Sequence, residues 1–187
     1  MKTLVFLLEE PSARELLKGV VPRLVPTDVH VEYLAFQGKQ DLERNIPKKI
    51  SAWKRPNSVF VVIRDQDSAP DCKTVKKKLT DLVNQSGKPA LVRVACRTLE
   101  AWVAGDLSAV AQAFGAPNLV SNQNKQKFRD PDALGSPYEE LRRLVPTYQK
   151  IDGAQRVGAL LSLDSNASTS FGFLCRGIRD LFTAEQA

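Results

Sequence analysis

Acidic residues follow three separate apolar segments of the chain. Glu9 and Glu10 come directly after TLVFLL, Asp65 and Asp67 end the segment SVFVVIRDQD, and Glu100 lies a few residues past ALVRVAC. While the backbone stays extended, residues two positions apart point to the same side, so Asp65 and Asp67 would share a face. Carboxylates that close repel each other unless a cation or a proton lies between them. The spacing therefore points to a cation site.

The scarcity of nitrogen and sulfur ligands limits which cation this could be. His30 is the single histidine, and the cysteines Cys72, Cys96 and Cys175 lie far apart without a Cys-x-x-Cys motif. A His-rich metal cage, a zinc site and a disulfide framework are therefore not expected. We expect reduced thiols, with Cys96 as inert core. Carboxylate oxygens alone select magnesium or manganese.

A simpler interpretation of the second acidic segment remains open. Asp65, Ser68 and Asp71 could form a turn and cap the Lys-rich helix that follows, because short polar side chains satisfy exposed backbone N–H groups there. We assign Asp71 to this capping role. Spacing alone does not separate a turn from a metal site for Asp65 and Asp67.

Apolar periodicity predicts the elements that would position these acids. Strands are expected at 3–8, 29–36, 58–64 and 90–96, with helices between them and one helical segment, LEAWVAGDLSAVAQAF, after the last strand. Pro47 should kink or divide the helix at 39–53. Strands that alternate with helices predict a mostly parallel α/β sheet of about four strands sandwiched by helices, with right-handed crossovers. Ligands bind at the carboxyl edge of such sheets, which is where the acidic residues lie.

The chain length suits one domain. It has 187 residues, of which 43% are hydrophobic, enough for a sizeable core. We expect residues 1–114 to form the α/β core and residues 115–187 to form a polar loop and C-terminal helices packed on that core. No segment approaches the length of a membrane span, so we expect a cytoplasmic protein that does not contact membranes.

Basic residues are in modest excess, with a formal net charge of +6. They form clusters, which are typical of phosphate-backbone contact but equally of solvated helix faces. The cluster of Lys125, Lys127 and Arg129 differs from the others because it lies in the polar loop, where a structural reason for these residues is not obvious. We therefore predict that this cluster contacts nucleic acid.

Two segments resemble the Toprim domain of topoisomerases, primases and overcoming-lysogenization-defect (OLD) nucleases. VFLLEEPSARELL looks like the strand-Glu-Gly-x-x-helix motif of that family, and VVIRDQDS looks like its Asp-x-Asp segment. Over nearly the whole chain, FQGKQDL, RDQDS, LEAWVAGD, PDALGSP, YQKIDGA and STSF are similar, in order, to motifs of the bacterial domain-of-unknown-function 4276 family.

The Toprim resemblance implies a magnesium- or manganese-dependent site. In it, Glu9 would act as general acid and base at the phosphate, Asp65 and Asp67 would ligate the metal together with Glu9, and Glu100 would be a further acidic ligand. Lys150, within the family motif YQKIDGA, is assigned to nucleic-acid contact.

The chain departs from the Toprim motif at two positions. Glu10 stands where the family has glycine, and Ala13 stands where it often has an acid. These departures are consistent with a site that is specialised, weakened or used only for binding.

Two functions follow from the resemblance. The first is a Mg-dependent nuclease or phosphodiesterase acting on DNA or RNA in a bacterial anti-phage or mobile-element system. The alternative is a non-catalytic adaptor that docks on an ATPase partner. The sequence has no Gly-x-x-x-x-Gly-Lys-Ser/Thr loop, so ATP hydrolysis would be the work of that partner.

Overall fold

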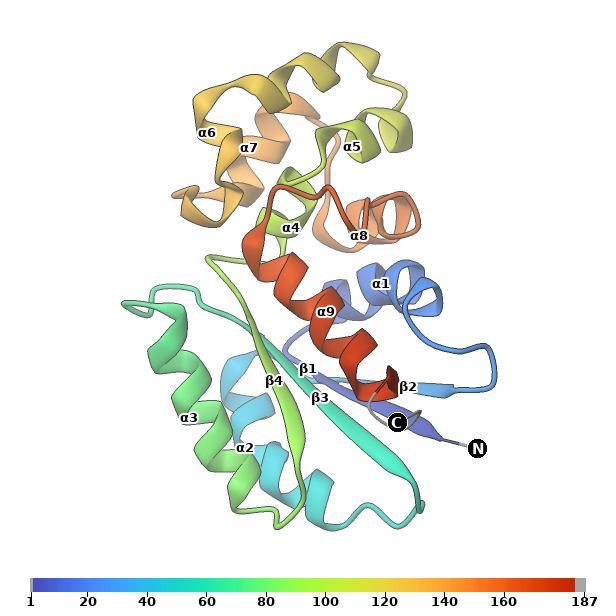
Figure 1. The fold of residues 1–187 in the computed structure, drawn as a ribbon. Helices are drawn as coiled ribbons and strands as arrows, with labels where there is room; N and C mark the ends of the chain where they lie inside the picture. Colours follow the sequence, from blue (N-terminus) through green and yellow to red (C-terminus); the bar gives the residue numbers. More distant parts are fainter. Residues whose placement is uncertain (1, 184–187) are drawn as a thin grey trace.

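A four-stranded parallel sheet forms the centre of the protein. The computed structural model describes residues 2–183, and its strands are β1 (Thr3–Leu8), β2 (His30–Ala35), β3 (Ser58–Asp65) and β4 (Ala90–Ala95), in the order β2-β1-β3-β4 (Figure 1). Every residue of β1 is buried, as expected for a strand covered on both faces. The predicted α/β fold class is confirmed.

Alternating side chains of β1 enter two separate cores. Leu4, Phe6 and Leu8 pack with the helices α1 (Pro11–Val20) and α9 (Thr169–Thr183) on one face. Val5 and Leu7 pack with α2 (Lys39–Ser51) and α3 (Cys72–Asn84) on the other. Figure 1 shows α2 and α3 on one side of the sheet, with α1 and α9 on the other. The sheet is therefore a rigid middle layer.

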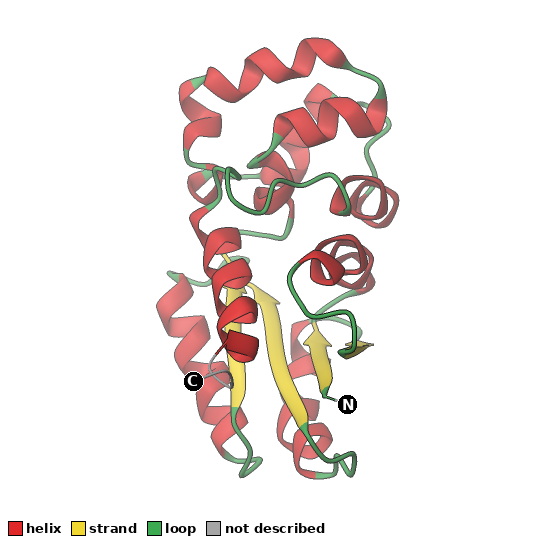
Figure 2. Cartoon of the chain, turned by 45° about the vertical axis from the view of Figure 1, so that its right-hand side comes forward, coloured by secondary structure: helices red, strands yellow, loops and turns green. Residues whose placement is uncertain are grey.

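The remaining helices gather beyond the carboxyl ends of the strands (Figure 2). They are α4 (Glu100–Ala104), α5 (Leu107–Phe114), α6 (Gln126–Arg129), α7 (Pro137–Leu144) and α8 (Lys150–Gly158), with the 3₁₀ turns η2 (Pro117–Asn124) and η3 (Pro131–Ala133). A further 3₁₀ turn, η1 (Val21–Arg23), directly follows α1. Close packing fixes α8 against α1, because a Cβ at Gly19 or Gly158 would collide with the backbone of the facing segment. This contact brings Lys150, the first residue of α8, towards the start of α1.

Three local features differ from the sequence expectations. The helical segment after β4 divides at Gly105, where the Asp106 side chain accepts a hydrogen bond from the Ala109 N–H (3.0 Å) and starts α5. Pro47 lies inside α2, which continues undivided to Ser51. The segment expected as a polar loop contains η2, α6 and η3, anchored by the buried Phe128.

The expectation that all three thiols are separate and reduced is wrong. Cys72 and Cys96 form a disulfide, with their Cα atoms 5.9 Å apart, while Cys175 is free and buried. Cys72 begins α3 and Cys96 follows β4, and both positions lie at the carboxyl edge of the sheet. A separation of 24 residues in sequence therefore becomes a short distance in space.

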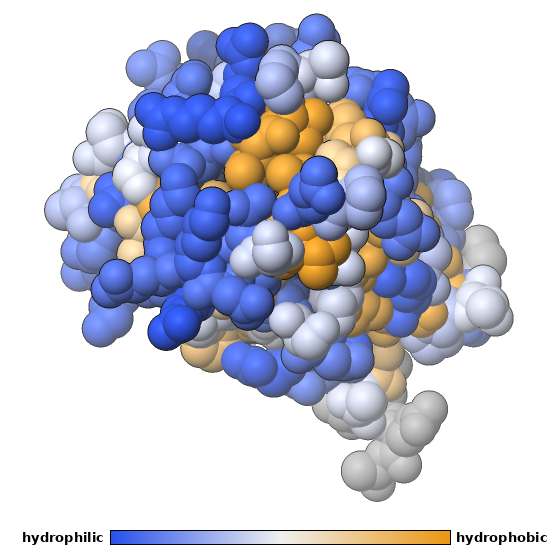
Figure 3. Space-filling view, turned by 90° about the horizontal axis from the view of Figure 1, so that it is seen from above, coloured by the Kyte–Doolittle hydropathy of each residue, from blue (hydrophilic) through white to orange (hydrophobic). Residues whose placement is uncertain are grey.

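The outer surface of the helical layer is largely hydrophilic. Figure 3, which looks down on this layer, shows polar residues around a restricted apolar area. Within residues 2–183, no helix has the length and apolar character that a membrane span requires.

Candidate functional site

Glu9 and Asp65 are held together where two neighbouring strands end. The Oε2 atom of Glu9 accepts a hydrogen bond from the backbone N–H of Asp65 (3.0 Å), and the Nε of Arg64 lies 3.9 Å from the same oxygen. Burial raises the pKa of Glu9, the hydrogen bond from Asp65 opposes this, and the charge of Asp67 adds to the upward shift. The parallel pairing of β1 with β3 is what brings the two acids together.

Asp65 is the most crowded of the acidic groups. It is 8% exposed, and its carboxylate accepts a hydrogen bond from the Leu99 backbone. Burial, followed by the negative charges of Glu100, Glu9 and Glu10, raises the pKa of Asp65 well above its ordinary value. We call Glu9, Glu10, Asp65 and Glu100 the strand-end carboxylates.

Glu100 contributes a buried oxygen without a hydrogen bond. The residue is 1% exposed, and its Oε2 accepts a hydrogen bond from the Thr98 hydroxyl (2.7 Å). Its Oε1 is buried and has no hydrogen-bond partner, with the Nζ of Lys150 3.9 Å away. A buried carboxylate oxygen left in this state is costly, and such atoms are often found where a ligand or ion binds.

Lys150 reaches the strand-end carboxylates from α8. Its Nζ lies 3.7 Å from Oε1 of Glu10, which also accepts a hydrogen bond from the Ser12 hydroxyl (2.6 Å). Burial lowers the pKa of Lys150, but the charges of Glu100, Glu10 and Asp65 outweigh it, so the net shift is upward. Lys150 therefore remains a cation and partly neutralises the cluster.

The extended backbone of β3 does not continue to Asp67. Its backbone is left-handed, with φ 54°, and its N–H donates to the carbonyl of Arg97 (2.8 Å). Its carboxylate pairs with the Nζ of Lys39 (3.2 Å). The chain leaves the strand after Asp65 and turns at Asp67, so the extended geometry on which a shared face depends ends between them.

An open cleft of about 670 Å³ adjoins this arrangement. Asp67 and Glu100 both line it, and so do three cationic side chains from different segments: Lys39, Arg97 and Lys150. Its other wall is formed by the start of α7, residues 135–139. Acids and bases face the same cleft, as in a site for a phosphate and its counter-ion.

The chemistry of the donors fits a divalent ion. All are hard carboxylate oxygens, one of them lacks a hydrogen bond, and their mutual repulsion would be relieved by a cation. Across residues 2–183, no group of three or more His, Cys, Asp or Glu side chains stands close enough together to hold a metal ion. Lys39 and Lys150 supply positive charge to these acids instead, so Asp67 would have to leave Lys39 to join Asp65 around an ion.

Two residues of the predicted nucleic-acid cluster are bonded to neighbouring segments of the helical layer. Lys127 pairs with Glu140 (2.6 Å), and the Nε of Arg129 donates to the Asn124 carbonyl (3.3 Å). Of the predicted basic residues, Lys150 lines the cleft, whereas Lys125, Lys127 and Arg129 are not part of its described lining.

Two charged neighbours of the site were not predicted from the sequence: Lys39 and Arg97, which are cations in the cleft. Lys39 could have been found, because it follows the second strand at the same carboxyl edge as the acids. Arg97 likewise follows the fourth strand.

Comparisons with known proteins agree with this architecture. The chain is similar to the solved structure of the C-terminal region of the Burkholderia pseudomallei OLD protein, with a TM-score of 0.59 and 17% sequence identity over 96% of this chain and 97% of that chain. At that identity, the likeness shows a common fold, in agreement with the α/β fold class expected from the sequence. No curated protein matches the chain. The model of the family described as a domain of unknown function (DUF4276) matches residues 8–179, and the chain therefore belongs to the DUF4276 family.

Proposed function

We propose that this protein is a metal-dependent phosphodiesterase that cleaves nucleic acid. The observation that carries the proposal is the buried Oε1 of Glu100, which lacks a hydrogen bond, at the sheet edge where Glu9 bonds to Asp65 and the charges of Glu9 and Glu100 act on Asp65. The adjoining cleft is lined by cations that suit a phosphodiester. The fold shared with the C-terminal region of an OLD protein supports a nuclease-type domain.

The proposal gives each group a role. Asp65, Asp67 and Glu100, together with Glu9, would hold Mg²⁺ or Mn²⁺. When bound, this ion supplies Lewis-acid stabilisation of the charge that develops on the phosphate. Glu9 would also transfer a proton at a phosphate oxygen, a role that suits a carboxyl group whose pKa is raised. Lys150 would orient the phosphate from α8.

Paired substitutions within one loop test this assignment. The double variant Asp65→Asn and Asp67→Asn keeps the shape of both side chains but removes their charges. We expect it to lose Mg²⁺- or Mn²⁺-dependent cleavage of DNA or RNA by about 100-fold or more. Thermal unfolding checks that the fold is retained.

Asp71→Asn is the matched control. Asp71 lies in the same loop and caps α3 by accepting a hydrogen bond from the Thr74 N–H (2.7 Å), and asparagine caps helices about as well. Cleavage by this variant should equal that of the wild type. Undiminished cleavage by the double variant would reject the roles given to Asp65 and Asp67.

We also propose that Lys125, which directly precedes α6, and the basic residues within α6, Lys127 and Arg129, bind the nucleic-acid backbone. Lys125 and Arg129 are the better candidates, because Lys127 already pairs with Glu140. If each contacts a phosphate, replacing either by alanine should reduce the slope of log affinity against log salt by about 1. The measurement is fluorescence anisotropy with a labelled oligonucleotide across a salt series, and an unchanged slope would remove these residues from the interface.

A second candidate function rests on the lysines in the acidic cluster. Because Lys39 and Lys150 already offset the carboxylate charge, the chain could serve as a non-catalytic adaptor for an ATPase partner in an anti-phage or mobile-element system. Failure of the wild-type protein to bind Mg²⁺ or Mn²⁺, together with co-purification of an ATPase, would favour the adaptor.

A further inference from the structure

A second pocket opens directly onto the Cys72–Cys96 disulfide. It has a volume of about 270 Å³ and lies between the start of α3, the strand β4 and the start of α9. Its lining includes both cysteines of the disulfide, together with Lys73, Lys76, Arg93 and Phe173. The disulfide is therefore reachable by a small molecule and is not buried in the core.

The charged residues in the described lining of this pocket are all cationic. Lys73, Lys76 and Arg93 line it, whereas no aspartate or glutamate belongs to its described lining. Asp71 acts on Lys73 and Asp180 acts on Arg93, both from outside that lining. The apolar part includes Phe173, which is 53% exposed. A small, negatively charged molecule with an apolar portion fits these walls.

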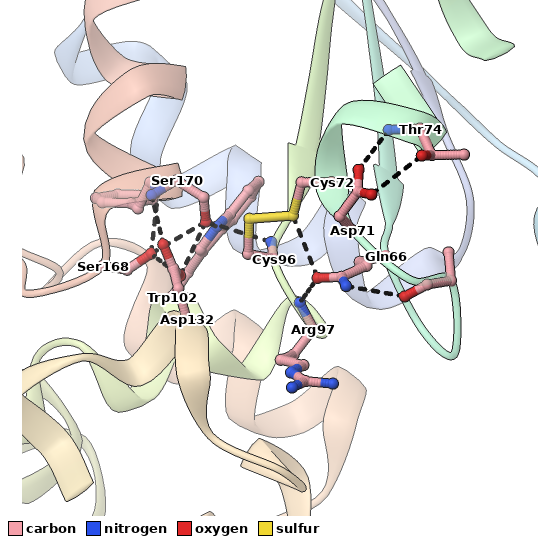
Figure 4. Close-up of a disulfide and its surroundings, with 12 residues drawn as sticks. Gln66, Asp71, Cys72, Thr74, Cys96, Arg97, Trp102, Asp132, Ser168 and Ser170 are labelled. Carbon is pink, nitrogen blue, oxygen red and sulfur yellow. Dashed lines mark hydrogen bonds between the residues drawn. A yellow bond between two sulfur atoms is a disulfide. The ribbon is translucent and has the colours of Figure 1, made fainter. Parts of the chain in front are cut away.

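The disulfide joins two segments that also form the strand-end cleft. Gln66 accepts a hydrogen bond from the Arg97 N–H through Oε1 (3.1 Å) (Figure 4). The Asp67 N–H donates to the Arg97 carbonyl (2.8 Å). Cys72 lies five residues after Asp67, and Cys96 directly precedes Arg97. The cross-link thus fastens together the segments that carry one acid and one cation of the cleft.

A second anchor holds the Cys96 side of this junction. The backbone N–H of Cys96 donates to the Ser170 hydroxyl (3.4 Å), which also receives the indole N–H of Trp102 (2.7 Å). Figure 4 shows Ser170 and Asp132 on the opposite side of the disulfide from Gln66. Because Cys96 is anchored to α9 in this way, breaking the disulfide would release mainly the segment between β3 and α3.

We propose that this pocket is the docking site of a small thiol bearing carboxylates, which exchanges with the Cys72–Cys96 disulfide. The thiolate of the incoming molecule attacks one protein sulfur, the bond between the two cysteines breaks, and the other sulfur leaves as a thiolate. A second molecule of the thiol then attacks the mixed disulfide. The products are the protein dithiol and the disulfide of the small thiol, so two electrons pass from two thiols to one protein disulfide.

Reduction by this route would loosen one wall of the strand-end cleft. The covalent link between the two segments would be lost, while the hydrogen bonds of Gln66 and Asp67 to Arg97 would remain. We therefore expect faster amide hydrogen exchange in residues 66–71 after reduction, with little change in β1. This expectation does not depend on nuclease activity.

The experiment compares thiols of different charge on the oxidised full chain. Glutathione is the anionic probe, 2-mercaptoethanol the neutral one and cysteamine the cationic one, each rate being divided by the rate of that thiol with a small uncharged disulfide. At low ionic strength the wild type should prefer glutathione over cysteamine by about 10-fold, and the preference should fall in high salt. Mass spectrometry of the Cys72 and Cys96 peptides measures the reduction.

Charge reversal on α3 tests whether the anionic thiol docks in this pocket. The double variant Lys73→Glu and Lys76→Glu should abolish or invert the preference for glutathione. The control variant Lys48→Glu and Lys49→Glu makes the same change in net charge at exposed positions of α2, outside the pocket. This control should keep the wild-type preference for glutathione. Equal preferences in the two double variants would overturn the proposal. So would peptide mapping that finds no Cys72–Cys96 disulfide in the oxidised protein.

Discussion

In two groups of charged residues in this protein, the pKa of an acidic side chain is shifted in opposite directions. On the surface of the helical layer, Glu140 pairs with Lys127 and with Arg143, each at 2.6 Å, and we call these three residues the Glu140 cluster. Hydrogen bonding by Lys127, supported by the other positive charge, lowers the pKa of Glu140. At the strand ends, burial and neighbouring acids raise the pKa of Asp65.

The opposite pKa shifts indicate that the Glu140 cluster stabilises the fold, whereas the strand-end carboxylates are suited to binding. The oxygens of Glu140 each have a cationic partner close by, so this acid is stable as it stands. The strand-end carboxylates have Lys150 at 3.7 Å and 3.9 Å and Arg64 at 3.9 Å, and one of their oxygens lacks a hydrogen bond. Partly compensated charge of this kind is found at functional sites, where it favours a ligand at the expense of stability.

Removing the lysine from each cluster gives the largest expected contrast. Lys150→Met should destabilise the metal-free protein by about 2 kcal/mol, less than for a fully buried pair because Lys150 is partly exposed. If the strand-end carboxylates bind a divalent ion, added Mg²⁺ should restore much of this loss. Thermal and urea unfolding, with and without Mg²⁺, provide the measurement.

Neutralising Asp65 should change the stability in the opposite direction to Lys150→Met. Asp65→Asn removes a negative charge from among like charges, and we expect it to stabilise the metal-free protein by about 1 kcal/mol at pH 7. The folded-state pKa of Asp65 lies above its unfolded value, so its unfavourable effect is absent below the unfolded pKa and develops as pH rises through the folded pKa.

The pH dependence provides the check on Asp65→Asn. The stability gain of this variant should shrink as pH falls, because the wild-type carboxyl group then becomes protonated and neutral, like the amide. Unfolding curves between pH 4 and pH 8 measure it, on a scale of about 1 kcal/mol. A gain that is constant with pH would show that the change acts through packing and not through charge.

The smallest effect is expected in the Glu140 cluster. Lys127→Met should cost less than about 1 kcal/mol, because Lys127 is half exposed and Arg143 remains as a partner. Since the folded pKa of Glu140 is lowered, the stability that it contributes is present above its unfolded pKa and lost as pH falls through the folded value. Added Mg²⁺ should not rescue this variant, and rescue equal to that of Lys150→Met would remove the contrast between the two clusters.

Much of the fold could be predicted from local patterns. Three of the strands are short, mainly apolar runs, β2 shows alternation, and Asp71 caps α3 as its position predicts. The convergence of Glu9 with Asp65 also followed from the rule that parallel strands end at one edge. Periodicity did not reveal the break at Gly105, because it depends on Asp106 binding both its own helix and the Ser162 N–H (2.7 Å).

The parts that sequence could not predict depend on contacts between distant segments. Lys150 reaches the acids because two glycines let α8 approach α1, and nothing near Lys150 in sequence indicates that approach. The extended backbone of β3 ends before Asp67, which has left-handed geometry, so the two acids do not follow the regular strand alternation. The pairing of Cys72 with Cys96 follows from where α3 begins relative to the end of β4, which spacing of cysteines does not show.

Calorimetric titration with Mn²⁺ and Mg²⁺ tests most directly whether the strand-end carboxylates form a cation site. Glu100→Gln keeps the shape of the side chain at the oxygen that lacks a hydrogen bond, and Glu140→Gln makes the same change in the paired surface cluster. We expect the wild type and Glu140→Gln to bind the ion alike and Glu100→Gln to bind it about 10-fold more weakly or not at all. Absence of binding by the wild type, or equal binding by Glu100→Gln, would contradict the account.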